Sequence, residues 1–372
     1  MISAITIRAF ALAIAALPLT AALTAAHARP TVEVAFVLDT TGSMGGLIEG
    51  AKRNIWSIAT TILDSNPDAE IRMGMVAYRD IGDDYVTKTY ELTTDIQDLY
   101  ANLLEMKARG GGDWPESVNE ALDVAVNKLH WTEKKDTRRI VFLVGDAPPH
   151  MDYAQDTKYP TTLAVAKQKD IIVNAVLAGS ARDTERVWQD IAQRGDGRFI
   201  PIPQDGGQVM IIETPYDGDI IILQNEINRT VIPYGPAPMQ KRTEDQTRQL
   251  SKVAAAAPAQ ASDMASYINK RSRSTSEAVT GGDLVSDVAA GRQKLEDVKE
   301  DELPDSLRKL APVQRAAEIE TQMRARKALN DKLAALVQKR DNYVAAQRDK
   351  APPKATSFDR EVEATLKVQL KR

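Results

Sequence analysis

The segment Asp39-Thr40-Thr41-Gly42-Ser43 places one carboxylate and two hydroxyl side chains within five residues. It follows an apolar run, residues 32–38, that has the composition of a buried strand. In an open parallel sheet, ligands collect at the carboxyl ends of the strands, and Gly42 allows the loop there to turn tightly. Oxygen ligands of this kind suit Mg²⁺, Mn²⁺ or Ca²⁺. Taken alone, the segment is equally compatible with Asp39 and Ser43 acting only as caps of the following helix.

Two further loops carry acidic residues where the same edge of the sheet is expected. The Gly-rich segment 110–117 presents Asp113 and Glu116 just before a predicted helix, and the apolar run 140–144 leads into Asp146. Each acid alone has a structural explanation as an N-cap, a first-turn acid or a turn former. Three loops from three parts of the chain nevertheless converge on one point. We therefore predict a divalent-cation site formed by Asp39, Thr41, Ser43, Asp113, Glu116 and Asp146.

The elements that must position these loops follow from the alternation of β-branched runs with segments of helical period. Strands are predicted at 32–38, 71–78, 85–91, 140–144, 171–177 and 198–202. Helices are predicted at 47–63, 96–106, 117–129, 161–169, 184–194 and 219–231. This pattern indicates an α/β fold, a doubly wound and mostly parallel sheet with helices on both faces. The turn between Tyr78 and Tyr85 predicts a hairpin at an antiparallel edge.

Three prolines between residues 233 and 238 divide the chain into a first domain, 29–236, and a tail, 237–372. The first domain has 21 Lys and Arg against 32 Asp and Glu, a net charge of −11, whereas the tail has a net charge of +6. The tail lacks tryptophan, and its most regular helix is expected at 313–347, where Leu329, Leu333, Leu336 and Tyr343 form a short stripe of coiled-coil type. We expect this basic, partly flexible helical tail to pack on the first domain, on a second copy or on a partner.

Residues 1–28 have the pattern of a secretory signal peptide with cleavage after Ala28. The alternative is an uncleaved membrane anchor. We expect export to the periplasm or secretion, with no stable membrane insertion after cleavage. The chain has no cysteine, which excludes disulfides, thiolate zinc sites and cysteine nucleophiles.

The residues described above resemble the von Willebrand factor A (VWA) domain with its metal-ion-dependent adhesion site (MIDAS), in the form found in exported bacterial proteins. The resemblance covers about residues 31–235. It implies that Thr41 and Ser43 bind the metal directly through their hydroxyls. It also implies that Asp39 and Asp146 act largely through bound waters.

The Gly-rich loop at 110–117 and the start of the first helix depart from the commonest form of that family. Asp113-Trp114-Pro115-Glu116 resembles the Asp-x-Pro-Glu of integrin β subunits, whose Glu is a metal ligand. The resemblance thus favours Glu116 as the ligand, with Asp113 as a neighbour or alternative. Gly45 and Gly46 stand where integrin β subunits have a pair of acids, so we do not expect their second, adjacent cation site.

Three other features near the motifs have simpler interpretations. His150 is compatible with a metal ligand or a pH-sensitive residue at the rim of the site, but we expect it to be a loop residue. Asp80, Asp83 and Asp84 are compatible with a second Ca²⁺ site, but their spacing is not that of a calcium loop, so we expect a solvated turn. Trp114 is equally compatible with a partner contact and with core packing.

The function expected from the sequence is that of an exported, non-enzymatic binding protein. Mg²⁺ is the expected cation, with Mn²⁺ or Ca²⁺ as alternatives, and the resemblance implies an open coordination position that an Asp or Glu of a protein partner fills, in adhesion or complex assembly. No catalytic residue and no organic cofactor is predicted. The alternatives are a scaffold whose tail carries recognition and, less favoured, a metal-dependent hydrolase. The net charge of −4 argues against nucleic-acid binding, and self-association through the tail stays open.

Overall fold

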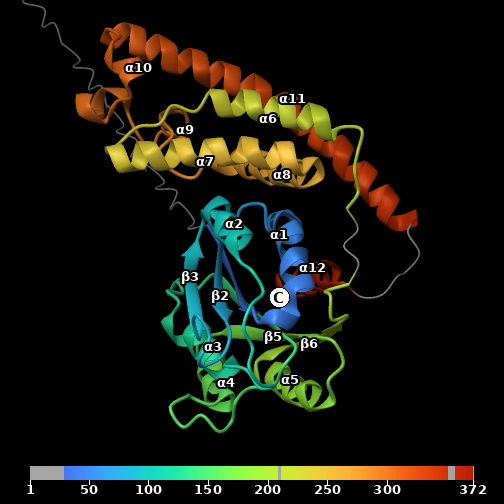
Figure 1. The fold of residues 1–372 in the computed structure, drawn as a ribbon. Helices are drawn as coiled ribbons and strands as arrows, with labels where there is room; N and C mark the ends of the chain where they lie inside the picture. The colour runs from blue at the N-terminus through green and yellow to red at the C-terminus, as the bar shows by residue number, and fades with distance from the viewer. Residues whose placement is uncertain (1–28, 208–210, 351–356, 372) are drawn as a thin grey trace, which may run out of the picture.

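The computed structural model describes residues 29–207, 211–350 and 357–371, so the predicted signal peptide lies outside the described residues. Its centre is a six-stranded sheet in the order β3-β2-β1-β4-β5-β6 (Figure 1). Only β3 runs antiparallel to its neighbour. The strands are β1 (Thr31–Asp39), β2 (Glu70–Tyr78), β3 (Thr87–Thr93), β4 (Thr137–Gly145), β5 (Ile171–Ala178) and β6 (Asp196–Ile202). The predicted fold class and the hairpin at the antiparallel edge are therefore confirmed.

Helices cover both faces of this sheet, which explains why its central strands are apolar on both sides. One face packs against α1 (Gly45–Ser65) and α2 (Ile96–Glu105). The other packs against α3 (Val118–Asp123), α4 (Tyr159–Gln168) and α5 (Arg182–Arg194). The helix predicted at 117–129 changes to a wider π-helical turn after Asp123, in which the Leu129 amide donates to the Val124 carbonyl at 3.1 Å. This turn keeps Leu129 in the core.

The C-terminal region forms a helical layer across one end of the sheet (Figure 1). It contains α7 (Ala237–Ala256), α8 (Pro258–Thr275), α9 (Leu284–Ala289), α10 (Asp305–Arg308) and α11 (Pro312–Lys350). Helix α6 (Asp217–Arg229), which the sequence-based boundary at Pro236 assigns to the first domain, packs against α8 and α11. The stripe of coiled-coil type on α11 faces this same chain, since Leu333 is buried in one cluster with Ile220 and Ile227 of α6. Among the described residues, none of the helices combines the length and apolar character needed to cross a bilayer.

The last helix, α12 (Phe358–Gln369), leaves this layer and returns to the sheet beside α1 (Figure 1). Phe358, Val362 and Leu366 are buried in the same core cluster as the inner face of α1. Gln369 and Asn174 of β5 exchange two side-chain hydrogen bonds, at 2.8 and 3.1 Å. Helix α12 therefore completes the cover of this sheet face next to β6, although more than 150 residues of chain separate the two elements.

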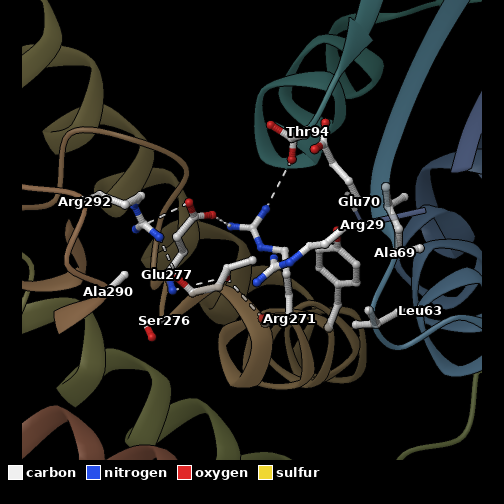
Figure 2. A pocket seen from close by; sticks show the side chains of 13 residues that line it. Arg29, Leu63, Ala69, Glu70, Thr94, Arg271, Ser276, Glu277, Ala290 and Arg292 are labelled. Atoms are coloured by element: carbon white, nitrogen blue, oxygen red, sulfur yellow. Dashed lines mark hydrogen bonds and ion pairs between the residues drawn. The ribbon is translucent and has the colours of Figure 1, made fainter. Parts of the chain in front are cut away.

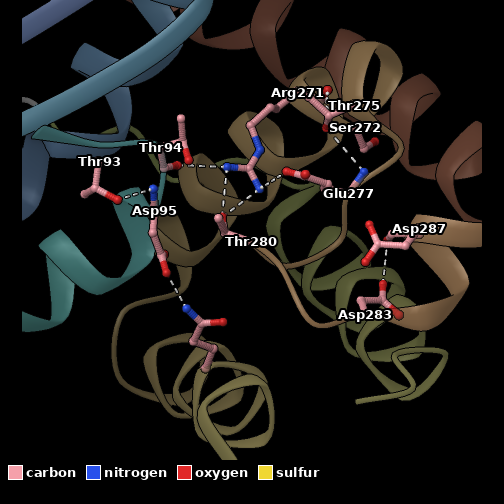
Figure 3. A network of polar contacts seen from close by, with 12 residues as sticks. Thr93, Thr94, Asp95, Arg271, Ser272, Thr275, Glu277, Thr280, Asp283 and Asp287 are labelled. Atoms are coloured by element: carbon pink, nitrogen blue, oxygen red, sulfur yellow. Dashed lines mark hydrogen bonds and ion pairs between the residues drawn. The ribbon is translucent and has the colours of Figure 1, made fainter. Parts of the chain in front are cut away.

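The helical layer meets the sheet domain at the amino-terminal end of the parallel strands, around a cavity of about 560 Å³. Arg271 of α8 donates from Nη1 to the Thr94 carbonyl at 3.2 Å, and Glu277 lies between Arg271 and Arg292 (Figure 2). Nearby, Asp95 caps α2 through Oδ1 and accepts from Gln246 of α7 at 2.5 Å through Oδ2 (Figure 3). These contacts hold the layer at the end of the sheet opposite to the predicted cation site, so the loops of that site remain uncovered by it.

Candidate functional site

The three predicted loops meet at the carboxyl ends of β1 and β4. Backbone hydrogen bonds join the first loop to the second, from the Gly42 amide to the Gly110 carbonyl at 3.1 Å and from the Arg109 amide to the Thr40 carbonyl at 3.0 Å. The second loop is joined to the third by the Glu116 amide, which donates to the Pro148 carbonyl at 2.9 Å. The backbone alone therefore fixes the relative positions of the loops.

Asp39 lies at the end of β1 and is fully buried. Its Oδ1 accepts from the Thr41 amide at 2.8 Å and from Thr41 Oγ1 at 2.7 Å. The Thr41 and Ser43 hydroxyl oxygens are 3.4 Å apart. The other carboxylate oxygen, Oδ2, is buried and has no hydrogen-bond partner within the described part of the chain. A buried carboxylate oxygen without a partner is costly, and a cation offers one means of satisfying it.

Glu116 and Asp146 bring two further carboxylates to the same place. Glu116 is 4% exposed, and its Oε2 is likewise buried without a partner among the residues that the structure describes. Its Oε1 packs so closely against Gly111 that a Cβ there would lie 3.3 Å from it and 3.3 Å from the Thr41 Cβ. Asp146 is buried, and its Oδ2 accepts from Gln204 Nε2 at 2.6 Å. Three buried carboxyl groups, near enough for their charges to interact, thus lie at the point where the loops meet, which is called the pocket below.

Burial and the repulsion between neighbouring carboxylates change the acidity of Asp39 and Glu116. Burial raises the pKa of Asp39 to about 7, against the opposing hydrogen bonds from Thr41 and with a further contribution from the charge of Asp146. Burial also raises the pKa of Glu116 to about 9, with added repulsion from Asp39, Asp80, Asp83 and Asp146. In the absence of a cation, the fold therefore favours the protonated, neutral forms of these carboxyls.

Metal-free protein is expected to lose stability as the pH rises. The pKa of each carboxyl is higher in the folded than in the unfolded chain. The contribution of each carboxyl to the free energy of unfolding is therefore fully present below its pKa in the unfolded chain. It is lost as the pH rises through about 7 for Asp39 and about 9 for Glu116. Urea unfolding in a chelator, between pH ~5 and ~9, should show a falling midpoint, with a loss on the order of kcal/mol rather than tenths. Asp39→Asn should make the urea midpoint depend less steeply on pH. A urea midpoint of wild type that rises between these pH values would contradict the burial of these carboxyls.

Of the six predicted residues, Asp39, Thr41 and Ser43 are linked by side-chain contacts. Glu116 and Asp146 lie near enough to Asp39 for their charges to interact. Asp113 lies apart from them. Its side chain is 63% exposed, and Oδ2 lies 3.7 Å from His150 Nε2. Within the second loop, Glu116 points into the pocket and Asp113 faces a neighbouring cluster.

The sequence interpretation underestimated the burial of two side chains beside the pocket. Asp80 is buried, so the interpretation of residues 80–84 as a solvated turn is wrong for this residue. It accepts from the hydroxyls of Ser117 and Tyr153, at 2.7 and 2.8 Å. His150 is a loop residue, as expected, but it is 5% exposed and stacks on Tyr153 with ring centroids 3.9 Å apart. The burial of Asp80 could have been anticipated from its position two residues after β2, which ends at the same edge of the sheet as β1 and β4.

Trp114 lies at the rim of the pocket. Its indole is 48% exposed and its Nε1 donates to Asp183 Oδ2 at 2.7 Å. Of the two interpretations from the sequence, core packing is therefore wrong, and the ring is available to a partner. Ile81 and Met151, on the neighbouring loops, are also about half exposed.

Comparison with known proteins identifies relatives of the sheet domain. Residues 33–212 match the family model described as the von Willebrand factor A domain. Over 126 residues the chain is 34% identical to a putative ariadne-like RING finger protein of Acanthamoeba polyphaga mimivirus, covering 33% of this chain and 12% of that protein. It is 27% identical over 129 residues to an alpha-protein kinase of Dictyostelium discoideum, and this match covers 34% of this chain and 20% of the kinase. It is 34% identical over 120 residues to von Willebrand factor A domain-containing protein 7 of Homo sapiens, and this match covers 32% of this chain and 12% of that protein. The matches thus span only a fifth or less of the length of these relatives.

Two solved structures resemble about half of the chain. The conserved hypothetical protein BatB from Bacteroides thetaiotaomicron has 20% identity and a TM-score of 0.36, covering 46% of this chain and 90% of that one. The VWA domain of SpRpn10 has 14% identity and a TM-score of 0.36, covering 48% and 89%.

Proposed function

Because residues 33–212 form a von Willebrand factor A domain, we propose that this chain is an exported, non-enzymatic binding protein that captures an acidic side chain of a protein partner through a divalent cation. The observation that carries the proposal is a pair of buried carboxylate oxygens, Asp39 Oδ2 and Glu116 Oε2, that have no hydrogen-bond partner in the part of the chain that the structure describes. They lie beside the Thr41 and Ser43 hydroxyls. An all-oxygen set of this kind fits Mg²⁺, with Mn²⁺ or Ca²⁺ as alternatives.

Each residue has a distinct part in this proposal. Thr41, Ser43 and Glu116 are the direct ligands. Asp39 orients the Thr41 hydroxyl by accepting its proton, so that the hydroxyl oxygen keeps its lone pairs for the cation. Asp146 supplies negative charge from the third loop, while Gln204 holds its carboxylate in place. A bound cation would favour the ionised forms of Asp39 and Glu116. Its attraction for the two carboxylates would offset the free energy that their burial costs.

The partner's carboxylate would complete the coordination of the cation. Neutral hydroxyls among the direct ligands leave the cation electron-poor, which favours an added anionic ligand. Around this point the exposed rim carries the apolar side chains of Ile81, Trp114 and Met151. The proposed partner segment therefore has an Asp or Glu flanked by apolar side chains, in adhesion or in complex assembly.

A peptide-display selection tests this function without a known partner. The full chain is immobilised, a random peptide library is bound in Mg²⁺, and bound peptides are eluted with chelator. We expect enriched peptides to share one Asp or Glu whose change to Asn or Gln abolishes binding. Immobilised Asp39→Ala protein is the matched counter-selection and should retain none of them. Enriched peptides without a required acid, or equal retention by Asp39→Ala, would refute the proposal.

A scaffold function of the helical region is the second candidate. This region buries clusters of its own, one of which joins α9 and α11 through Leu284, Leu303 and Ile319. It is thus an ordered body at the end of the sheet opposite the pocket. Partners that bind equally well to Asp39→Ala and in chelator would favour this second function.

A further inference from the structure

A second group of metal-ligand side chains lies beside the pocket, formed by Asp80, Asp113 and His150. One ligand atom from each lies within 4.8 Å of the other two. Asp80 and His150 are buried, whereas Asp113 reaches in from the exposed second loop. The three residues come from the ends of β2 and β4 and from the loop before α3. The proposed function assigns no role to any of them.

The histidine is held so that one ring nitrogen faces the two carboxylates. Its Nδ1 is 2.9 Å from Asp152 Oδ1, which assigns the Nδ1 proton to this hydrogen bond. The ring stacks on Tyr153, and the backbone is fixed by Asn119 Nδ2, which donates to the His150 carbonyl at 2.7 Å. Nε2 is buried and makes no hydrogen bond within the described residues. A carboxylate on Nδ1 with a lone pair on Nε2 is the arrangement of histidines that bind metals.

The distances around Nε2 also suit shared ligation better than hydrogen bonding. Nε2 is 3.4 Å from Asp80 Oδ2 and 3.7 Å from Asp113 Oδ2. A charge-assisted N–H···O bond would measure about 2.7–2.9 Å. Two ligands that bind one tetrahedral ion at about 2.1 Å are separated by about 3.4 Å. Ser117 and Tyr153 donate to the Asp80 carboxylate and hold it in orientation.

We propose that Asp80, Asp113 and His150 form a second cation site, selective for a transition-metal ion of the Zn²⁺ class. One imidazole nitrogen with two carboxylate oxygens prefers Zn²⁺ and its neighbours, whereas the all-oxygen pocket prefers Mg²⁺. The remaining coordination positions lie toward the exposed side of Asp113 and are filled by water. The site links the second and third loops, and thereby braces Glu116 from outside the pocket.

Calorimetric titration of Zn²⁺ into the chelator-treated full chain, in saturating Mg²⁺, tests this site separately from the first. Wild type should bind one Zn²⁺, and His150→Gln should weaken that binding at least tenfold. Asp113→Asn should also weaken it at least tenfold, and because this side chain is largely exposed, the variant should fold as wild type does. Asp39→Asn should lose Mg²⁺ binding and keep its Zn²⁺ affinity within about threefold.

His130→Gln is the matched control. This histidine is exposed and paired with Glu91 at 3.1 Å, and its loss should leave Zn²⁺ affinity unchanged. Absence of Zn²⁺ binding in wild type would overturn the proposal. Equal affinities of His150→Gln and His130→Gln would overturn it too. Loss of Zn²⁺ binding in Asp39→Asn alone would place the ion in the first pocket. Zn²⁺ binding and the Mg²⁺ binding of Asp39→Asn are measured separately, so failure of the second site is distinguishable from failure of the proposed function.

Discussion

Asp39→Asn is expected to remove the stabilisation by Mg²⁺ while leaving the metal-free protein at least as stable as wild type. Asparagine keeps an acceptor for the Thr41 amide and hydroxyl, and it removes a carboxylate whose burial raises its pKa to about 7. In wild type, Mg²⁺ at about 100 times its dissociation constant should add about 2.7 kcal/mol. For a domain of this size that corresponds to roughly 5–10 °C in Tm. Thermal unfolding of wild type and of Asp39→Asn, with Mg²⁺ and with chelator, measures both the Mg²⁺-dependent shift in Tm and the stability of the metal-free proteins.

Asp68→Asn is the matched control for this experiment. Asp68 is an exposed acid in the turn before β2, at the opposite end of the sheet. Asp68→Asn should therefore show the same Mg²⁺-dependent rise in Tm as wild type. A Mg²⁺ shift in Asp39→Asn equal to that of wild type would show that the cation binds elsewhere. A metal-free Asp39→Asn that unfolds well below wild type would show that the buried carboxylate is a stabilising element of the fold.

Leu366→Ala is expected to destabilise the whole sheet domain, although residue 366 lies more than 150 residues after the last strand. Its side chain is fully buried between α12, α1 and the sheet. A cavity at such a position costs about 2–5 kcal/mol. Urea unfolding followed through tryptophan fluorescence measures the loss, because Trp56 of α1 lies in the same core cluster.

Val368→Ala provides the control in the same helix. Val368 is 51% exposed, so its truncation should change the free energy of unfolding by no more than about 0.5 kcal/mol. Equal stabilities of Leu366→Ala and wild type would contradict the packing of α12 on the sheet. A separate early transition in Leu366→Ala, with the sheet domain unfolding as in wild type, would mean that α12 is an accessory rather than part of the core.

Most of the sheet domain was predictable because its strands are buried on both faces. Continuous β-branched runs such as 140–144 have few alternatives to a central parallel strand, and the turn at 79–84 between two tyrosines marks the hairpin. The candidate pocket was predictable for the same reason. Once the parallel strands were placed, the loops with Asp39 and Asp146 had to lie at one edge.

The position of α12 was not predictable, because the sequence shows an apolar helix face without showing what covers it. An apolar face is predicted by the spacing of four between Phe358, Val362, Leu366 and Leu370. That this face packs on the sheet beside α1 is determined by tertiary contacts, which the local sequence does not show. The same limit applies to α6, whose apolar residues pack on α11 rather than on the sheet. Asp80 and His150 were misjudged because their burial involves contacts between different loops. Asp80 accepts from Ser117 and Tyr153, and the His150 carbonyl accepts from Asn119 of α3.

The central claim is that the three loops hold one divalent cation at the hydroxyls of Thr41 and Ser43. Crystals of the full chain grown with Mn²⁺ test it most directly, through an anomalous difference map. The account predicts a peak within about 2.5 Å of both hydroxyl oxygens and of a Glu116 carboxylate oxygen. No peak in this pocket, in crystals that bind Mn²⁺ at another place, would contradict it.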